Sequence, residues 1–224
     1  MLAFDGLTGG YGAADVVFEV SGEVAAGQVL GVFGRNGVGK TTLARLLQGS
    51  LPVRRGTIRL GGQRIETLRP CRRRQLGLGY MPQTGMVFDD LTVRENLSLI
   101  RAATDPATFF ELFPRLGERL DQKAGRMSGG ERKILSFVRT ISEDSTLLVF
   151  DEPSEGVQPE NILRMEWCLK QRRAEGAAIV LIEQNLSMLT AVADSYLGLD
   201  TGRVVLRGAR DAIGDDDLRG VLSI

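Results

Sequence analysis

The sequence contains no histidine, and among its 224 residues only two are cysteines and only four are lysines. Histidine is the usual side chain for proton chemistry near neutral pH, so in this chain such chemistry would fall to other groups. Cys71 and Cys168 are too few for a disulfide framework, which favours a reducing compartment. Because lysine is rare here, a lysine inside a motif stands out.

Two further absences limit the partners and the location of the protein. The 28 basic residues balance 28 acidic ones, so no overall field attracts nucleic acid or a membrane surface. No apolar run approaches the roughly 18 residues of a membrane span, and the first ten residues lack the basic and apolar regions of a signal peptide. We therefore expect a cytoplasmic protein that reaches a membrane only through a partner. The basic run Arg72 to Arg74 is interpreted as a solvated face.

The chain is long enough for one large α/β domain or two small ones. Runs of strand length alternate with runs of helical spacing, as in proteins with a largely parallel sheet. The predicted strands lie at 15–20, 28–34, 146–152 and 177–183, the hairpins at 56–66 and 195–208, and the helices at 41–49, at 160–176 and from 186 onward. Between about 91 and 141 the signals become mostly helical, since Thr92 with Glu95 and Ser128 with Glu131 fit the capping box that opens a helix. The sequence thus predicts an α/β fold with a helical insertion in the middle.

The segment GRNGVGKTT matches the phosphate-binding pattern G-x-x-x-x-G-K-[ST]. Its glycines let consecutive backbone N–H groups turn toward a phosphate chain, and the helix that follows adds its positive end. Lys40 is suited to reach the β- and γ-phosphates, and the Thr41 hydroxyl is suited to bind Mg²⁺. A merely tight turn is the alternative, but the motif follows a predicted strand and opens a predicted helix. The candidate phosphate-binding residues are Gly34, Arg35, Asn36, Gly37, Val38, Gly39, Lys40, Thr41 and Thr42.

Two carboxylates end the predicted strand at 146–152. Ligands of α/β sheets bind at the carboxyl ends of the strands, so Asp151 and Glu152 are expected near the phosphate loop. Adjacent side chains on a strand point in opposite directions, and the two can therefore have different tasks. We expect Asp151 to support Mg²⁺ and Glu152 to orient or deprotonate the attacking water. Together with the phosphate loop, this pair indicates a P-loop nucleotide hydrolase.

The segment MSGGE, residues 127 to 131, has two interpretations that its local pattern supports equally. One is a capped helix start with two flexible glycines. The other is a second anion site, in which Ser128 and the N–H groups of Gly129 and Gly130 lie at the positive end of a helix. The order of motifs along the chain decides between them.

This order resembles that of the ABC ATPases, and the resemblance covers nearly the whole chain. GYMPQ is similar to the glutamine loop of that family, which implies that Gln83 lies near Mg²⁺ and the coupling surface. MSGGE resembles the signature motif, with Met127 in place of the usual leucine, and VFDEPSEGVQP resembles the second nucleotide motif followed by the D-loop. Tyr11 stands where the family has an aromatic residue that stacks on adenine, a contact worth on the order of 1–3 kcal/mol in base-binding sites. The alternative for Tyr11 is a core or turn residue.

The resemblance implies a single ABC ATPase domain over residues 1–224. Its nucleotide-binding core would comprise about 1–86 and 142–224, with a mostly parallel core sheet and an N-terminal antiparallel β portion. A helical subdomain would occupy about 87–141. The implied ligands are ATP and Mg²⁺.

Particular residues take on roles through this resemblance. The residues implied to hold the metal are Thr41, Gln83 and Asp151. In a head-to-tail dimer, Ser128 and Gly130 of one subunit would complete the ATP site of the other, and Gly129 and Glu131 of the same motif are also implied to be nucleotide-binding.

The polar triplet Glu183, Gln184 and Asn185 follows directly after an apolar strand. Most ABC ATPases have a histidine where this chain has Gln184. If strand 179–182 runs beside the strand that bears Asp151, Gln184 lies near the γ-phosphate. Its amide can then donate to a phosphate oxygen without titrating near neutral pH, which makes Gln184 a catalytic candidate beside Glu152. The alternative is that Gln184 caps the helix that begins after it.

Longer segments resemble the ATPases of importers for branched-chain amino acids, urea and short amides. These segments are YMPQTGMVFDDLTVRENL, LFPRLGERLDQKAGRMSGGE and LIEQN, while DEPSEGVQP is closer to the urea and amide branch. Gln158 replaces the usual D-loop aspartate. The resemblance implies ATP-driven uptake through a membrane permease. The ATPase would be a homodimer or heterodimer on the inner face of the plasma membrane, with a periplasmic substrate-binding protein as an indirect partner.

Two other functions compete with import. The first is the ATPase of an exporter, such as a lipopolysaccharide extractor, and the second is a soluble ABC ATPase that acts on DNA or ribosomes. Against the second, only 87 residues separate Lys40 from Ser128, which leaves no room for a long coiled-coil arm. The sequence also has one nucleotide site instead of a tandem pair, and its balanced charge predicts no nucleic-acid partner.

Overall fold

The computed structural model describes residues 1–84 and 87–223 and contains two β-sheets. The smaller sheet is antiparallel and has the strand order β2–β1–β4–β5. Its strands are β1 (Leu2–Tyr11), β2 (Ala14–Val24), β4 (Arg55–Leu60) and β5 (Gln63–Arg64). The predicted N-terminal antiparallel portion is confirmed, and β4 with β5 forms the hairpin expected at 56–66.

The larger sheet has the strand order β10–β9–β3–β8–β7–β6. Its strands are β3 (Val29–Phe33), β6 (Leu78–Met81), β7 (Leu147–Asp151), β8 (Ala178–Ile182), β9 (Ser195–Asp200) and β10 (Arg203–Ala209). Neighbouring strands are parallel except β9 and β10, which form the predicted C-terminal hairpin. β8 lies beside β7 with Ile182 paired to Asp151, as expected for the strand that precedes Gln184.

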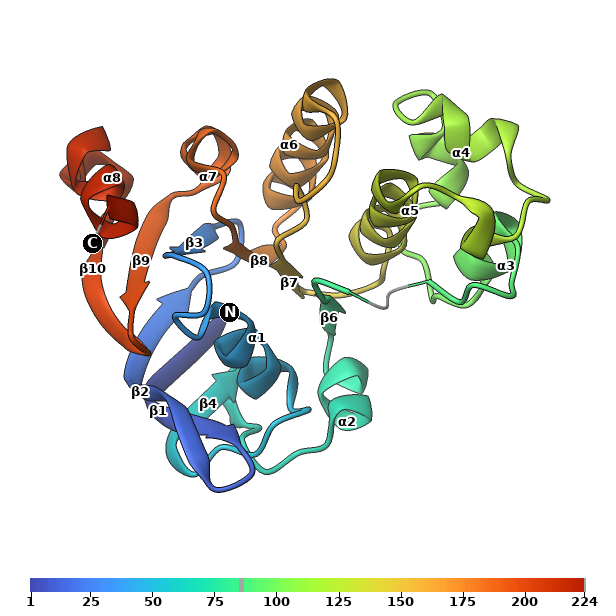
Figure 1. Ribbon diagram of the computed structural model, residues 1–224. Coiled ribbons are helices and arrows are strands. Elements are labelled where there is room, and N and C mark those ends of the chain that lie inside the picture. Colours follow the sequence, from blue (N-terminus) through green and yellow to red (C-terminus); the bar gives the residue numbers. More distant parts are fainter. Residues whose placement is uncertain (85–86, 224) are drawn as a thin grey trace.

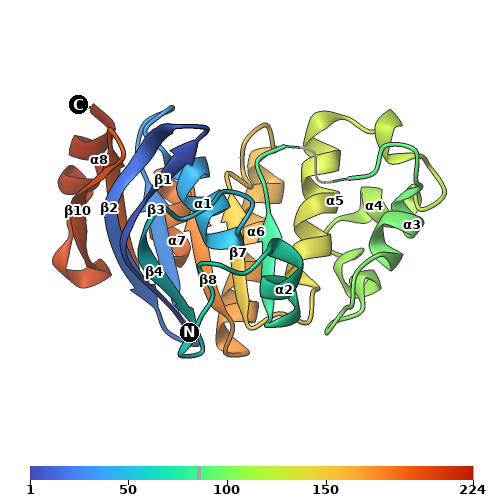
Figure 2. The same cartoon turned by 90° about the horizontal axis from the view of Figure 1, so that it is seen from below.

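Helices cover both faces of the larger sheet (Figure 1). On one face lie α6 (Pro159–Ala174), α7 (Leu186–Val192) and α8 (Asp215–Ser223), and on the other face α1 (Lys40–Gln48) lies between the two sheets. Beyond β6, a group of helices lies away from the antiparallel sheet (Figure 1, Figure 2), namely α3 (Val93–Ser98), α4 (Pro114–Glu118) and α5 (Gly129–Ile141). The shorter elements are α2 (Pro70–Gln75) and 3₁₀ turns at Pro106–Phe109, Ala124–Arg126 and Arg210–Ala212. In the described ranges, no helix is both long and apolar enough to cross a membrane.

The helical segments at 93–98 and 129–141 begin as predicted. Both capping boxes form, with the Thr92 side chain accepting from the Glu95 backbone and the Ser128 side chain from the Glu131 backbone. The expected limit of the nucleotide-binding core at residue 86 lies outside the described residues. The division into core and helical subdomain stays a prediction.

Two hydrophobic clusters, one on each face of the larger sheet, follow from the period of two in its strands. In β7, Leu148 and Phe150 belong to the cluster that contains residues of α5, α6 and α7. Leu147 and Val149 belong to the cluster that contains residues of α1 and the antiparallel sheet. Asp151 continues this second series, so its side chain emerges on the face that α1 covers.

The basic run Arg72 to Arg74 is not only a solvated face, which corrects the expectation from the sequence. Arg72 and Arg74 are exposed, but Arg73 is only 1% exposed. The Arg73 guanidinium donates to the carbonyl oxygens of Leu46 and Leu47 at 2.7 and 2.6 Å, and to two further carbonyls. Carbonyls at a helix C-terminus have no partner within the helix, and a cation satisfies them well. Arg73 therefore holds the far end of α1, the helix that follows the phosphate loop.

Candidate nucleotide site

The phosphate loop joins β3 to α1 and has a backbone that requires glycine. Gly34 has a φ of 152°, and a Cβ there would lie 2.2 Å from the Leu199 carbonyl oxygen. Gly39, the residue before α1, has a φ of 107°. Glycine tolerates both the positive φ and the close approach. Because Gly39 has no side chain to cap α1, the first N–H groups of this helix depend on other acceptors, such as an anion.

Lys40 is the first residue of α1, and its side chain folds back onto the phosphate loop. Its ammonium donates to the carbonyl oxygens of Gly34 at 2.9 Å and Arg35 at 2.8 Å, and it lies 3.3 Å from Glu152 Oε1. The Lys40 side chain is 4% exposed. A buried cation is tolerated because it is paired and hydrogen-bonded. The loop therefore concentrates positive charge where a phosphate chain would lie.

Thr41 and Asp151 bring two oxygen groups together at the carboxyl end of β7. Thr41 Oγ1 donates to Asp151 Oδ1 at 3.2 Å, whereas the buried Oδ2 of Asp151 has no hydrogen-bond partner within the described residues. Burial raises the pKa of Asp151 to about 6, and the hydrogen bond from Thr41 acts in the opposite direction. Mg²⁺ prefers oxygen ligands, so an unpartnered carboxylate oxygen beside a hydroxyl fits this ion. In residues 1–84 and 87–223 no cluster of three or more His, Cys, Asp or Glu ligands occurs.

Glu152 follows β7 with a φ of 50°, in the left-handed region. Such a conformation costs a non-glycine residue on the order of 1–3 kcal/mol and is common at active sites. Two amides contact its carboxylate in addition to Lys40. Gln184 Nε2 donates to Oε1 at 2.7 Å, and Gln83 Nε2 donates to Oε2 at 2.8 Å. The fold thus brings together Lys40, Gln83, Glu152 and Gln184. The sequence predicted each of them as a site residue from a different segment of the chain.

Gln184 bridges Glu152 and the phosphate loop. Its amide also donates to Asn36 Oδ1. The N-cap of α7 is Asn185, whose side chain accepts from the backbone N–H of Met188. The alternative interpretation of Gln184 as the helix cap is therefore wrong.

Glu183, the third member of the polar triplet, has a role that the sequence did not reveal. It is 2% exposed, and its Oε1 accepts from the Ser154 backbone N–H at 2.7 Å. Its Oε2 accepts from the backbone N–H groups of Gln184 at 3.1 Å and Asn185 at 3.3 Å. Burial raises the pKa of Glu183, and these hydrogen bonds act in the opposite direction. One carboxylate thus joins the segment after β7 to the segment after β8.

Tyr11 lies at the rim of a hollow of about 380 Å³ beside the phosphate loop. Its side chain is not part of the core, because Tyr11 is 43% exposed. Arg45 of α1 donates to the Tyr11 hydroxyl at 3.1 Å, and its guanidinium lies 5.8 Å from the ring centroid. Of the predicted site residues, those that line the hollow are Tyr11, Asn36, Gly37, Gly39, Lys40, Thr41, Thr42, Gln83 and Glu152. Arg35, which is exposed, and Val38, which is buried, do not line it.

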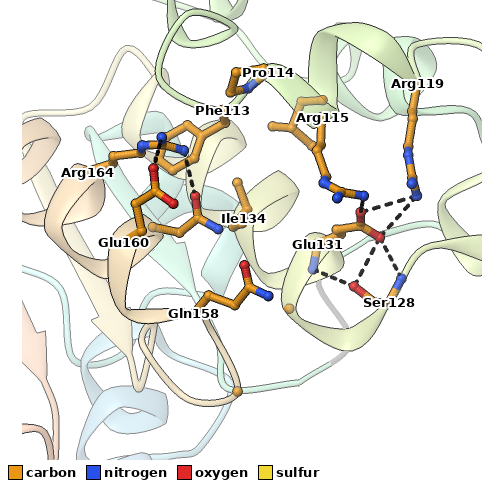
Figure 3. A pocket seen from close by; sticks show the side chains of 14 residues that line it. Phe113, Pro114, Arg115, Arg119, Ser128, Glu131, Ile134, Gln158, Glu160 and Arg164 are labelled. Carbon is orange, nitrogen blue, oxygen red and sulfur yellow. Dashed lines mark hydrogen bonds and ion pairs between the residues drawn. The ribbon is translucent and has the colours of Figure 1, made fainter.

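The residues of MSGGE, at the start of α5, do not line this hollow, and three of them, Ser128, Gly130 and Glu131, border a different pocket of about 640 Å³ (Figure 3). Ser128 Oγ donates to Glu131 Oε2 at 3.0 Å. Arg119 and Arg115 point toward the same carboxylate, at 3.2 and 3.8 Å from Glu131 Oε1. Within one chain, the signature residues and the phosphate loop therefore form separate sites.

Gly130 fixes the distance between the signature and the segment after β7. A Cβ on Gly130 would lie 2.8 Å from the Gly156 carbonyl oxygen, closer than side chains are found. Gln158, which ends this segment, borders the same pocket as Ser128. The two segments thus present one surface.

A family model described as ABC transporter matches residues 17–155, which include the phosphate loop, the signature and both carboxylates. The chain belongs to the ABC transporter family.

Relatives within the ABC transporter family carry different functional names. The high-affinity branched-chain amino acid transport ATP-binding protein BraG of Pseudomonas aeruginosa is 36% identical, over 95% of this chain and 94% of that protein. The lipopolysaccharide export system ATP-binding protein LptB of Acidithiobacillus ferridurans is 30% identical, over 91% of this chain and 88% of that protein. A solved structure of the ATP binding subunit of an ABC transporter is 28% identical with a TM-score of 0.82, over 100% of this chain and 95% of that one.

Family membership and these similarities identify the chain as an ATP-hydrolysing transporter ATPase, and they confirm the predicted α/β fold. Within this ABC transporter ATPase, the roles of individual site residues stay predictions. The geometry adds two residues that the motifs did not assign to the site, namely Glu183 and Lys133, whose ammonium donates to the Gln83 carbonyl oxygen. For Lys133 a signal existed, since it is one of only four lysines and stands two positions after the signature.

Proposed function

We propose that this protein is the ATP-binding and ATP-hydrolysing subunit of an ABC importer, which drives uptake of amino acids, urea or amides through a membrane permease. The observation that carries this proposal is the 36% identity to BraG over nearly the full length of both chains. The ATPase would lie on the inner face of the plasma membrane and depend on a periplasmic binding protein only indirectly.

In this proposal the hollow beside the phosphate loop holds ATP. The backbone N–H groups of the loop and Lys40 bind the phosphates, and Tyr11 stacks on the adenine. Thr41, Asp151 and Gln83 would hold Mg²⁺, which when bound neutralises phosphate charge. The buried, unpartnered oxygen of Asp151 beside the Thr41 hydroxyl supports this assignment.

Hydrolysis then depends on Glu152 and Gln184. Glu152 accepts a proton from the attacking water, and Gln184 donates from its amide to the γ-phosphate. The contacts of both Gln184 and Lys40 with Glu152 support a shared catalytic role, because they hold the carboxylate next to the phosphate loop.

The second half of each ATP site would come from another subunit. Ser128, Gly130 and Glu131 border a pocket separate from the phosphate hollow, and Gly129 does not line the phosphate hollow either, so one chain alone does not assemble the full set. A head-to-tail homodimer, or a heterodimer with a related subunit, would join the two halves.

The test of the ATPase mechanism is Glu152→Gln, which removes the base and keeps the size of the side chain. The variant should bind ATP without turnover and accumulate as a dimer, measured by light scattering with and without ATP. Glu175→Gln, an exposed carboxylate at the end of α6, is the matched control and should hydrolyse at the parental rate. Parental hydrolysis by Glu152→Gln would remove it from the role of base, and ATP binding without dimer formation would contradict the shared site.

Export is the second candidate, favoured by the 30% identity to LptB. Transport direction can be tested in a deletion strain of the source organism that carries either the parental gene or the Glu152→Gln variant. Import predicts that the variant fails to restore uptake of radiolabelled leucine, urea or acetamide. Unchanged uptake together with loss of surface lipopolysaccharide would favour export instead.

A further inference from the structure

Lys133 is a partly buried cation that contacts two segments of the nucleotide site from α5. Its side chain is 10% exposed. Its ammonium donates to the backbone carbonyl oxygen of Gln83 at 2.8 Å and lies 3.7 Å from Glu155 Oε2. Gln83 follows β6 and Glu155 follows β7, so one side chain spans the ends of two neighbouring strands.

The side chain of Gln83 closes the same group of contacts. Its Nε2 donates to Glu155 Oε2 at 3.2 Å and to Glu152 Oε2 at 2.8 Å. Lys133 therefore contacts the backbone of Gln83 and also the carboxylate of Glu155, which accepts a hydrogen bond from the Gln83 side chain. If the Gln83 amide rotated away from Glu152, its hydrogen bond to Glu155 would break as well. The Lys133 ammonium lies beside the Glu155 carboxylate and so favours the position in which both hydrogen bonds form.

A purely structural role for Lys133, as an anchor of α5, has little support in the packing. The helix is held by apolar side chains in the main cluster, namely Ile134, Leu135, Phe137, Val138 and Ile141. Burying these side chains contributes far more than a single ion pair with a half-exposed carboxylate. Removing a cation from water costs free energy. In functional sites, buried charged side chains of this kind hold a neighbouring functional group in its working orientation.

We propose that Lys133 is a positioning residue for ATP hydrolysis, which fixes Gln83 so that its amide stays on the Glu152 carboxylate. This inference rests on the proposed role of Glu152 as the base. Lys133 itself touches neither the nucleotide hollow nor the reacting atoms; it acts through Gln83.

The first test is Lys133→Met, which keeps the length of the side chain and removes the ammonium. A small misplacement of a group near the reacting atoms costs up to about a hundredfold in rate, so we expect kcat to fall by about tenfold. ATP affinity, measured in the Glu152→Gln background, should stay near the parental value. Lys133→Arg keeps the charge and the donors and should recover part of kcat. Lys170→Met, an exposed lysine on α6, is the matched control and should leave kcat unchanged.

The decisive test is a double-mutant cycle on kcat with Gln83→Ala. If Lys133 acts through the Gln83 amide, adding Lys133→Met to Gln83→Ala should lower kcat little further. Independent, multiplied losses would overturn the proposal. So would a Lys133→Met variant with a lowered melting temperature whose kcat is parental at a temperature where it is fully folded. Failure of the proposed function would appear earlier, as hydrolysis by Glu152→Gln with Lys133 intact, and is therefore distinguishable.

Discussion

Replacing Gln184 by alanine removes one amide with two contacts in the site, at 2.7 Å from Glu152 Oε1 and with Asn36 Oδ1. Losing one preorganised transition-state donor costs roughly 3–4 kcal/mol, or about 10² to 10³ in rate. In this site Lys40 at 3.3 Å and Gln83 at 2.8 Å still contact Glu152, so the carboxylate keeps two of its partners. We therefore expect a smaller loss than this range, a fall in kcat of about ten- to hundredfold. ATP affinity should change much less.

The assay is steady-state ATPase activity, with ATP binding measured separately in the Glu152→Gln background. Asn185→Ala provides a matched control at the next position, because Asn185 is the cap of α7. Loss of a cap costs about 1 kcal/mol of folding stability, so this variant should melt earlier and keep its turnover rate. A Gln184→Ala variant that keeps more than half of the parental kcat would refute the reasoning. The same conclusion would follow if Asn185→Ala lost turnover equally.

Gln184→His refines the same prediction. An imidazole can donate from nearly the same place, so the variant should retain part of the activity. Its pKa is ordinarily about 6.5, and protonation adds a positive charge beside Glu152 and the phosphate loop. The ratio of variant to parental rate should therefore change between about pH 6 and 7. A ratio that is constant across this range would place the introduced imidazole away from the reacting groups.

Three further predictions follow from the geometry. The Ser128→Arg variant by itself should be inactive, yet a mixture with the Lys40→Ala variant should regain activity through one composite site per heterodimer. A mixture that stays inactive although both variants form dimers would contradict a shared site. Arg73→Met should lower the free energy of unfolding by about 1–3 kcal/mol, measured by denaturant melting, because the buried carbonyls at the end of α1 lose their donor, whereas Arg73→Lys should lose less. Activity should fall as the pH drops through about 6, since Asp151 then takes up a proton. Excess Mg²⁺ should move this fall to lower pH because the metal ion and the proton compete for the same carboxylate. A fall that does not respond to Mg²⁺ would contradict Asp151 as a ligand.

The sequence predicted features that depend on neighbours along the chain. The phosphate loop, the two capping boxes and the strand that delivers Asp151 are each set by local spacing and the period of two. β1 was missed because three glycines and repeated register shifts interrupt its alternation. β6 and α2 were missed because each is too short to establish a period.

Contacts between distant segments could not be predicted in this way. Gln83 meets Glu152 across 69 positions, and Lys133 meets Gln83 across 50. Such partners are set by which strands become neighbours, and β6 lies beside β7 only in the folded sheet. The burial of Arg73 has the same origin, because its acceptors lie at the end of α1, 26 and 27 positions away. A run of three arginines carries no sign of which one turns inward.

Each residue of the polar triplet after β8 has its own contact, and the one beside Glu152 is an amide and not an imidazole. Glu183 accepts three backbone N–H groups and so fixes the loop, Asn185 caps α7, and Gln184 is left with its amide directed at Glu152. An amide donates at every physiological pH, whereas an imidazole in that place would change charge between about pH 5 and 8. The chain contains no histidine, so the donor beside Glu152, the proposed base, keeps its charge state over this range. Burial raises the pKa of Asp151 to about 6, so under the proposed roles a change of activity near this pH would come from Asp151 and not from the donor at position 184.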